Sequence, residues 1–205
     1  MPIKPATNGA FYSAIAQILI RDNTFDAVAM ACPTQKAAEA AGYGGYTNAT
    51  YLVITDENHP NYRKLMRAAD AGLEEPPADP AATTQPTYYV VIDAATGAPA
   101  LHTDAAKGDL FFEGEVNGVK VRTGFSMLRD SVNERTIDEY AEITGIPANT
   151  IERLAAQFAE AAPAASIEPS WRGAYGCAYA NSGETARAVA LFNTLLGCWN
   201  QPGGA

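Results

Sequence analysis

The residues best suited to chemistry lie in a short loop near the end of the chain, Arg172–Gly176, which reads RGAYG. An arginine on a glycine-bearing loop can bind a phosphate or another oxyanion through two parallel N–H···O bonds. The same guanidinium can instead form an ion pair with a carboxylate of this region, either Glu168 or Glu184. The sequence leaves both interpretations open.

The residues that flank this loop predict a strand before it and a helix after it. Residues 165–168 (ASIE) fit a short buried strand. Asn181 or Ser182 fits the cap of a helix whose apolar residues recur every three or four positions up to Leu196, and Gly197 then stops it. A strand, a glycine-bearing loop and a helix N-terminus form the usual cradle for an anion or a cofactor. The alternative is an ordinary βα unit, because neither a GxGxxG motif nor a P-loop is present.

Composition limits the partners of the chain. Its 205 residues carry a formal net charge of -9, and the pI is about 4.7. This acidity argues against non-specific nucleic-acid binding, which needs a basic surface. No apolar run approaches the roughly 20 residues of a membrane-spanning helix, and no signal peptide precedes the first expected helix. We therefore expect no nucleic-acid partner and no direct membrane contact.

Metal-ligating residues are few and widely spaced. The three cysteines (Cys32, Cys177 and Cys198) form no CxxC pair, and His59 and His102 are the only histidines. This pattern argues against a structural zinc ion or an iron–sulfur cluster held by this segment alone. Cys177 follows the glycine-bearing loop directly and fits either a thiolate near a helix N-terminus or a small buried residue.

Groups for acid–base or nucleophilic catalysis are no better placed. Asp56 and Glu57 are adjacent, so their side chains point apart. His59 lies in a polar loop, which favours a hydrogen-bonding surface residue over a general base. Ser166 and Ser182 have neither a nearby histidine nor the surroundings of a nucleophile elbow. We expect no catalytic residue and no metal ligand in this chain.

Hydrophobic periodicity and turn residues predict a mixed chain of helices and strands. Residues 73–86 are rich in proline and alanine and predict a linker or surface loop. Asn117-Gly118 predicts a type I′ hairpin turn. Residues 62–69 predict a helix that groups three basic side chains, either as a solvated face or as a ligand site.

The other expected elements follow from caps and periodicity. Helices are expected at about 10–21 (capped by Thr7 or Asn8), 24–29 (capped by Asn23 or Thr24), 35–41, 125–132, 137–145 (with a capping box of Thr136 and Glu139) and 149–162 (with a box of Asn149 and Glu152). Strands are expected at 51–54, 87–93, 110–115 and 119–123.

Three blocks of sequence resemble one known family. They are PIKPATNGAF at 2–11, ITGIPANTIERLAAQFAEAAP at 143–163, and RGAYG with NSGETARAVALFNTLLGCWNQPGG at 172–204. In this order and spacing they resemble the catalytic subunits of the dimethyl sulfoxide reductase family, molybdenum enzymes that carry two pyranopterin guanosine dinucleotides. Residues 47–72 and 88–97 are most similar to the tetrathionate-reducing members. Thiosulfate, polysulfide and arsenate reductases and catechol dehydroxylases remain alternatives.

The resemblance implies cofactor-binding positions in this sequence. The family's PGTD motif corresponds to Pro5–Asn8, and its acid lies near a guanine of the cofactor. Asn8 replaces that acid, so a carboxylate–guanine pair cannot be carried over. The family loop that approaches the molybdopterin corresponds to Arg172–Gly176, and the helix after it opens with Ser182 and Glu184. The implied cofactor-binding residues are Thr7, Asn8, Arg172, Gly173, Tyr175, Gly176, Ser182 and Glu184.

The resemblance also implies the fold class: an α/β, Rossmann-like three-layer fragment with a small β-hairpin insertion. Residues 1–145 would belong to the second Rossmann-like domain, with the insertion at about 87–123. Residues 146–205 would return to the other Rossmann-like cofactor-binding domain. We expect the chain to be an internal piece of a larger subunit. The molybdenum ligand and the cysteines of a 4Fe-4S cluster would lie upstream, a further cofactor-binding domain downstream, and the piece alone would be inactive.

For the intact enzyme, the resemblance implies reduction of an oxyanion such as tetrathionate at a molybdenum bis(molybdopterin guanine dinucleotide) centre. It further implies two partners, an iron–sulfur electron-transfer subunit and a membrane anchor subunit. A role in anaerobic respiration and a place on the periplasmic or extracytoplasmic face of the membrane are implied as well. Two other classes stay open: a non-catalytic α/β binding or scaffold domain, and a small module that binds a guanine nucleotide.

Overall fold

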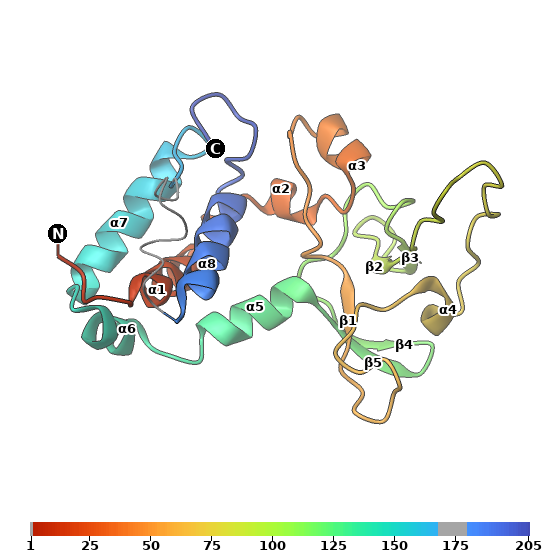
Figure 1. Cartoon of the computed structure of the whole chain (residues 1–205), viewed down its shortest axis with the longest axis horizontal. Coiled ribbons are helices and arrows are strands. Elements are labelled where there is room, and N and C mark those ends of the chain that lie inside the picture. Colours follow the sequence, from red (N-terminus) through yellow and green to blue (C-terminus); the bar gives the residue numbers. More distant parts are fainter. Residues whose placement is uncertain (1, 168–179) are drawn as a thin grey trace. The chain divides into compact units, whose positions relative to one another are not determined.

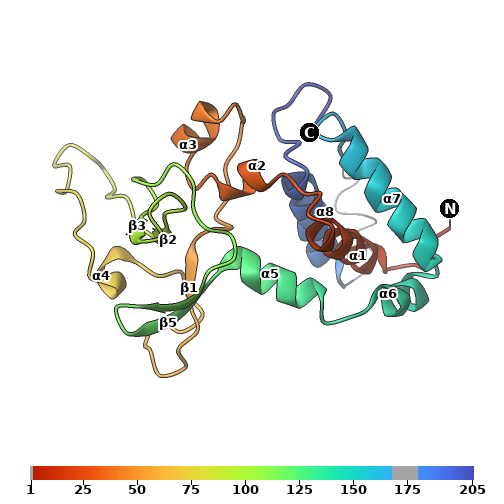
Figure 2. The same ribbon diagram turned by 180° about the vertical axis from the view of Figure 1, so that it is seen from behind.

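The structure is a computed structural model that describes residues 2–167 and 180–205. The chain forms two compact units. The first is Met1–Ala29 with Arg129–Ala205, and the second is Met30–Leu128 (Figures 1 and 2). Helices and small antiparallel sheets are both present, so the predicted mixed α/β class is confirmed. The division near residue 145 concerns the domains of a whole enzyme and stays a prediction.

The first unit is built around one buried helix, α1 (Asn8–Arg21). It packs against α6 (Ile137–Thr144), α7 (Ala148–Ala161) and α8 (Ser182–Leu195). Both views show α1 between α7 and α8 (Figures 1 and 2). Helix α1 buries its apolar stripe in this bundle, which is how an amphipathic helix gains most of its stability. The largest side chains that become fully buried here include Ile15, Leu19, Ile151, Phe192 and Leu195.

Of the two capping boxes that the sequence predicts in this unit, the structure contains one. The capping box at the start of α6 is confirmed, because Glu139 N donates to Thr136 Oγ1 at 3.2 Å and Thr136 N donates to Glu139 Oε2 at 2.6 Å. The predicted box at Asn149 and Glu152 is wrong. Helix α7 already begins at Ala148, and Glu152 instead accepts two hydrogen bonds from Arg21, at 2.8 and 2.9 Å.

Helix α2 (Ala27–Ala31) is capped by a residue that the sequence did not single out. Asp26 Oδ1 accepts from Val28 N at 3.1 Å and from Ala29 N at 2.9 Å. The expected cap at Asn23 or Thr24 is therefore wrong. A carboxylate at this position satisfies two amides of the first turn.

The second unit contains two small antiparallel sheets. One has the order β1 (Leu52–Ile54), β5 (Val119–Thr123) and β4 (Glu113–Val116). The other pairs β2 (Val90–Ile92) with β3 (Pro99–Leu101). Every strand pair within the described residues is antiparallel, so the parallel sheet of a Rossmann-like fold is not among them. The short helices of this unit are α3 (Gln35–Ala40) and α4 (Ala68–Ala71), and α5 (Gly124–Val132) runs from it into the first unit.

The hairpin between β4 and β5 has the predicted turn. Asn117 has φ 51° and Gly118 has φ 74°, and Val116 pairs with Val119 across them. Two positive φ values in a two-residue loop define type I′, whose twist matches that of the strands. The strands themselves are shorter than expected. The ends of the predicted strands 87–93 and 110–115 lie outside β2 and β4.

The predicted helix at 62–69 is wrong. Residues 62–64 form turns, and residues 65–67 are extended between the two sheets, since Met66 N donates to Leu52 O at 2.7 Å and Val90 N donates to Met66 O at 3.1 Å. Only the last residues of the segment join α4. Tertiary hydrogen bonding has overridden local propensity, because the extended backbone completes the pairing of strands on both sides.

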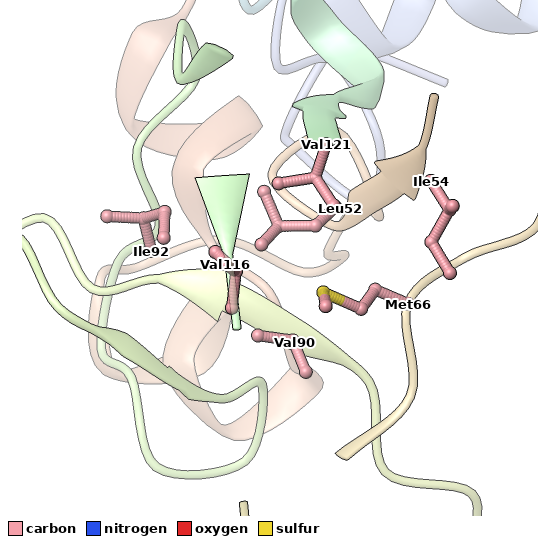
Figure 3. Close-up of a cluster of buried hydrophobic side chains, with 7 residues drawn as sticks. All are labelled: Leu52, Ile54, Met66, Val90, Ile92, Val116 and Val121. Carbon is pink, nitrogen blue, oxygen red and sulfur yellow. The ribbon is translucent and has the colours of Figure 1, made fainter. Parts of the chain in front are cut away.

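The core of the second unit lies on one face of these strands. Met66 is fully buried beside residues of both sheets, and Figure 3 shows the side chains gathered between them. The opposite face carries a smaller cluster of Tyr51, Val91 and Ala105, with Leu65 and Tyr89 packed against it. Alternation along extended backbone explains this division. The main cluster consists of Leu52, Ile54, Met66, Val90, Ile92, Val116 and Val121.

Gly108 is a position where a side chain does not fit. A Cβ there would lie 2.5 Å from Thr50 Cβ, Thr50 is fully buried, and Gly108 N is held by Ala31 O at 2.9 Å. We expect Gly108→Ala to lower the free energy of unfolding by about 1–3 kcal/mol, as overpacking does. Urea unfolding followed by circular dichroism measures this.

The matched control is Gly183→Ala. Gly183 has open space around its Cβ direction and lies in the first turn of α8, where alanine gains up to about 1 kcal/mol of helix propensity. In a double-mutant cycle, Thr50→Gly should cost less beside Gly108→Ala than alone. Equal stability of the Gly108→Ala variant and the parent chain would refute the steric argument.

His102 makes the second unit sensitive to mild acid. Its ring contacts those of Tyr51, Tyr88 and Tyr89, and its Nδ1 accepts from Tyr89 N at 3.2 Å. Burial lowers the pKa of His102 below its ordinary value of 6.5. The unfolded chain therefore takes up the proton first. The contribution of neutral His102 to the free energy of unfolding is fully present above pH 6.5. It is lost as the pH falls toward the lower pKa that His102 has in the folded state.

Urea unfolding of this unit on both sides of that pH checks the expectation. His102→Asn, whose amide oxygen can accept the same bond, should remove the acid-dependent loss. His59→Gln should retain it. An unchanged acid response in the His102→Asn variant would show that another group is responsible.

Candidate functional site

The N-terminal ends of α1 and α8 lie together, although 174 positions separate Asn8 from Ser182 in sequence. Asn181 Nδ2 donates to Ala6 O at 2.7 Å, and a Cβ on Gly9 would lie 3.5 Å from Thr185 Oγ1. At the opposite ends, Asp26 N donates to Leu195 O at 2.7 Å. The two helices are therefore parallel and begin at the same end of the first unit.

Parallel helices place their positive dipole ends side by side. The first amides of each helix have no partner within the helix, and the dipoles add about half a positive charge at each N-terminus. Both helices have 14 residues, so neither dipole is weakened by a short length. Such an end can accept a phosphate or another anion.

Four of the predicted cofactor-binding residues lie at this shared end. Thr7 Oγ1 donates to Lys4 O at 2.7 Å, which fixes the turn before α1. Asn8 and Ser182 are the first residues of their helices, Asn8 half-buried and Ser182 beside the Asn181 contact. Glu184 is exposed and forms an ion pair with Arg187 one turn further along. This pair raises the pKa of Arg187.

A second contact fixes the chain before α1. Lys4 N donates to Thr144 O at 2.9 Å, and Lys4 Nζ donates to Glu142 O at 2.6 Å. A lysine on the carbonyl groups of a helix C-terminus is favoured by the negative end of its dipole. The turn that carries Thr7 and Asn8 is thus held by α6 as well as by α8.

The other four candidates, Arg172, Gly173, Tyr175 and Gly176, lie outside the described residues, as does Cys177. Residues 165–167 precede them and form no strand, so the expected buried strand is wrong for this part. The structure therefore brings together the two helix N-termini, and the loop of the predicted cradle lies outside the described ranges.

Asn193 is a residue of this region that sequence reasoning missed. It is 2% exposed, its Oδ1 accepts from Ile167 N at 3.0 Å, and its Nδ2 donates to Ile167 O at 2.9 Å. The amide thus fastens the end of the segment that leads into Arg172–Gly176 to α8. The signal was present, since Asn193 lies four positions after Val189 on the buried face of the helix.

The buried cysteines give the candidate site no reactive thiolate, and the described residues give it no group of metal-ligating side chains. Cys32 and Cys198 are buried, and burial raises the pKa of Cys198, which opposes formation of its thiolate. Within residues 2–167 and 180–205, no three histidine, cysteine, aspartate or glutamate residues are grouped so that they could hold a metal ion. In the same ranges, no helix combines the length and the apolar character needed to cross a bilayer.

Known proteins give the context for this geometry. No family model matches the chain. The chain is 26% identical over its whole length to the A subunit of selenate reductase from Mesobacillus selenatarsenatis, of which it covers 18%. It is 28% identical, again over 100% of its length, to the A subunit of sulfite dehydrogenase from Allochromatium vinosum, covering 21%. It is 25% identical over 80% of its length to the A subunit of tetrathionate reductase from Archaeoglobus fulgidus, covering 13%.

The chain thus spans between 13% and 21% of the length of these relatives. All three relatives are A subunits of enzymes named for oxidising or reducing an oxyanion of sulfur or selenium. The matches agree with the resemblance carried by the three sequence blocks, and two of those blocks supply the paired helix N-termini. The chain is thus similar to a part of the A subunits of these oxidoreductases, as the resemblance of the three sequence blocks to the molybdopterin oxidoreductases implies.

Proposed function

We propose that this chain forms part of the cofactor-binding framework in the A subunit of a molybdopterin oxidoreductase. One observation carries the proposal: the blocks PIKPATNGAF and NSGETARAV, at opposite ends of the sequence, meet as two parallel helix N-termini. Packing alone accounts for apolar contacts between α1 and α8. It does not require both helices to begin at one end with hydroxyl and amide side chains in their first turns.

The chemistry of these donors fits a guanine dinucleotide. Asn8 offers both a donor and an acceptor, which matches the edge of a guanine, whereas a carboxylate offers acceptors alone. The hydroxyl of Ser182 and the first-turn amides of α8 can bind phosphate oxygens. Positive side chains for the pyrophosphate would come from Arg172, whose guanidinium can bind two oxygens at once. When bound, molybdenum bis(molybdopterin guanine dinucleotide) supplies the redox chemistry, and these residues hold and orient it.

The substrate class proposed for the whole enzyme is a small oxyanion of sulfur or selenium, with tetrathionate as the specific candidate. The names of the relatives support the class, and similarity at 47–72 and 88–97 supports the candidate. An upstream iron–sulfur cluster, an electron-transfer partner, a membrane anchor and a periplasmic location complete the proposal. The non-catalytic binding or scaffold domain remains the alternative.

The experiment uses the full-length protein that contains this segment. In that protein, Asn8→Leu and Ser182→Ala should each reduce bound guanine nucleotide and molybdenum about tenfold under limiting cofactor, as expected for the loss of one or two hydrogen bonds. Asn8→Asp, which restores the acid of the family motif, should retain the cofactor. Nucleotide released by acid and molybdenum measured by elemental analysis give the readout, and turnover of tetrathionate, selenate and sulfite identifies the substrate.

Asn149→Ala is the matched control, because Asn149 is exposed near the start of α7 and lies far in sequence from the first residues of α1 and α8. It should leave cofactor content unchanged. Unchanged cofactor in both Asn8→Leu and Ser182→Ala would contradict the proposed role of this end of the bundle. A full-length protein without molybdenum would favour the scaffold alternative.

A further inference from the structure

A hollow in the second unit is lined by side chains that suit a separate ligand site. It encloses about 400 Å³ and is lined by Asn61, Lys64, Leu65, Arg67 and Tyr89. It lies along the extended segment that the sequence predicted as a helix, between β1 and β2. The cofactor-binding candidates all belong to the other unit, so the proposed function does not account for this group of residues.

The extended backbone explains why Leu65 and Arg67 share one face of the hollow. Arg67 pairs with Tyr89 and Leu65 pairs with Val53 in antiparallel bridges. Because Met66 points into the main core, its neighbours Leu65 and Arg67 point to the opposite face. A cation and an aromatic ring therefore stand directly across from each other. In the helix predicted from sequence, Arg67 would not have met Tyr89.

The aromatic wall of the hollow is fixed by packing. The ring of Tyr89 lies 5.4 Å from that of Tyr51 and 5.9 Å from that of His102, measured between centroids. Tyr51 is itself buried, and its hydroxyl donates to Pro33 O at 2.8 Å. Tyr89 is half-buried, so its ring offers a partly exposed apolar surface next to Leu65.

The cations of the hollow are not neutralised by carboxylates. In the described part of the chain, Arg21, Arg122, Arg129 and Arg187 each form an ion pair with an acid, but Lys64 and Arg67 form none.

Asp70, an acid that bonds to Asn61 of the hollow, is already engaged. Its Oδ1 accepts from Asn61 Nδ2 at 3.2 Å and lies 3.9 Å from His59 Nε2, and its Oδ2 accepts from the backbone N of Arg67 at 3.1 Å. Lys64 Nζ donates only a long bond of 3.4 Å, to Asn61 Oδ1. The positive charges of Lys64 and Arg67 thus remain available to a ligand.

We infer that this hollow binds a small anion that carries a flat apolar group, as an aromatic carboxylate does. The guanidinium of Arg67 binds both carboxylate oxygens, and Lys64 adds a second positive charge. The ring of the ligand rests against Tyr89 and Leu65, where aromatic contact adds to burial of apolar surface. A bare inorganic anion lacks the contacts with Tyr89 and Leu65. An uncharged aromatic ring lacks the charge interactions with Arg67 and Lys64.

Three probes separate these contributions on the full 205-residue chain. Benzoate, benzamide and sulfate are each titrated while amide chemical shifts are followed by NMR. Benzoate should bind with a dissociation constant on the order of millimolar and shift the amides of Leu65, Arg67 and Tyr89. Benzamide and sulfate should bind at least about tenfold more weakly, because each loses one set of contacts. Equal binding of sulfate, or no shifts with benzoate at tens of millimolar, would overturn the inference.

Variants test the assignment of the charges. Arg67→Met and Lys64→Met keep much of the aliphatic stem, and both side chains are exposed, so folding should be retained. Arg67→Met should weaken benzoate binding about tenfold, and Lys64→Met should weaken it less, since lysine acts as a single point charge. Lys107→Met, at an exposed lysine outside the hollow, is the control for net charge. An equal loss in the Lys107→Met variant would mean that benzoate senses only the overall charge.

Discussion

Phe192→Ala is expected to lower the free energy of unfolding of the helical unit by about 3–5 kcal/mol, the cost of removing a buried aromatic side chain. Phe192 is fully buried on α8. Its ring meets that of Phe158 on α7 edge to face at 4.8 Å, and that of Tyr12 on α1 at 5.8 Å. One side chain therefore joins three helices. Domains are commonly stable by only about 5–15 kcal/mol, so this change alone can bring the unit close to unfolding.

Tryptophan fluorescence during urea unfolding measures this loss in the correct unit. Both tryptophans of the chain, Trp171 and Trp199, belong to Arg129–Ala205. The control is Phe111→Ala. Phe111 is 44% exposed and lies in the second unit, so its replacement should leave the fluorescence transition in place. If Phe192→Ala also left that transition unchanged, the packing of α8 against α1 and α7 would not determine the stability of the unit.

Local signals in the sequence predicted much of the helical unit. Thr136 with Glu139, Gly145 and Gly197 act over three or four residues, and the structure contains the cap or helix stop that each predicts. The same holds for Asn117-Gly118, whose turn depends on two backbone conformations. Such features depend on neighbours in sequence, so they can be predicted before the tertiary fold is known.

The wrong predictions involve contacts between residues that are distant in sequence. Residues 62–69 have helical periodicity, yet their backbone pairs with Leu52 and Val90. Glu152 fits a capping box, yet it serves Arg21 across the bundle. In both cases a long-range hydrogen bond replaces a local one of similar strength, and only the fold decides between them.

The candidate site shows the same limit. Resemblance to the family selected Thr7, Asn8 and Ser182, but no local pattern predicts that α1 and α8 run parallel and begin together. That arrangement depends on the packing of their apolar faces and on the bond from Asn181 to Ala6. The loop 172–176 lies outside the described residues, so its assignment remains a prediction.

Asn193→Ala is expected to cost about 2–4 kcal/mol, because it leaves two backbone groups unpaired and a buried polar group that loses its partner costs about 1–3 kcal/mol. The N–H and the C=O of Ile167 both bond to the Asn193 side chain, at 3.0 and 2.9 Å, and Asn193 is 2% exposed. Urea unfolding by tryptophan fluorescence measures the loss, and hydrogen exchange of the Ile167 amide should become faster at the same time.

Asn193→Leu distinguishes hydrogen bonding from packing. Leucine has a similar volume and fills the space, so a cavity would be avoided, but both bonds would still be lost. Because both variants lose the same two bonds, we expect the leucine variant to remain nearly as unstable as the alanine variant. Recovery of stability with leucine would mean that Asn193 acts mainly by filling space, and its role as an anchor for the segment before Arg172 would fail.

In the full-length enzyme, the same change tests whether the anchor serves the cofactor. Ile167 precedes Arg172 by five residues, which leaves a short tether between the Asn193 side chain and the predicted molybdopterin loop. Loss of the anchor should lower bound guanine nucleotide and molybdenum without altering Thr7, Asn8 or Ser182. Asn149→Ala again provides the control for removal of an asparagine side chain. Full cofactor content in an Asn193→Ala enzyme that still folds would show that the loop is positioned by contacts other than this one.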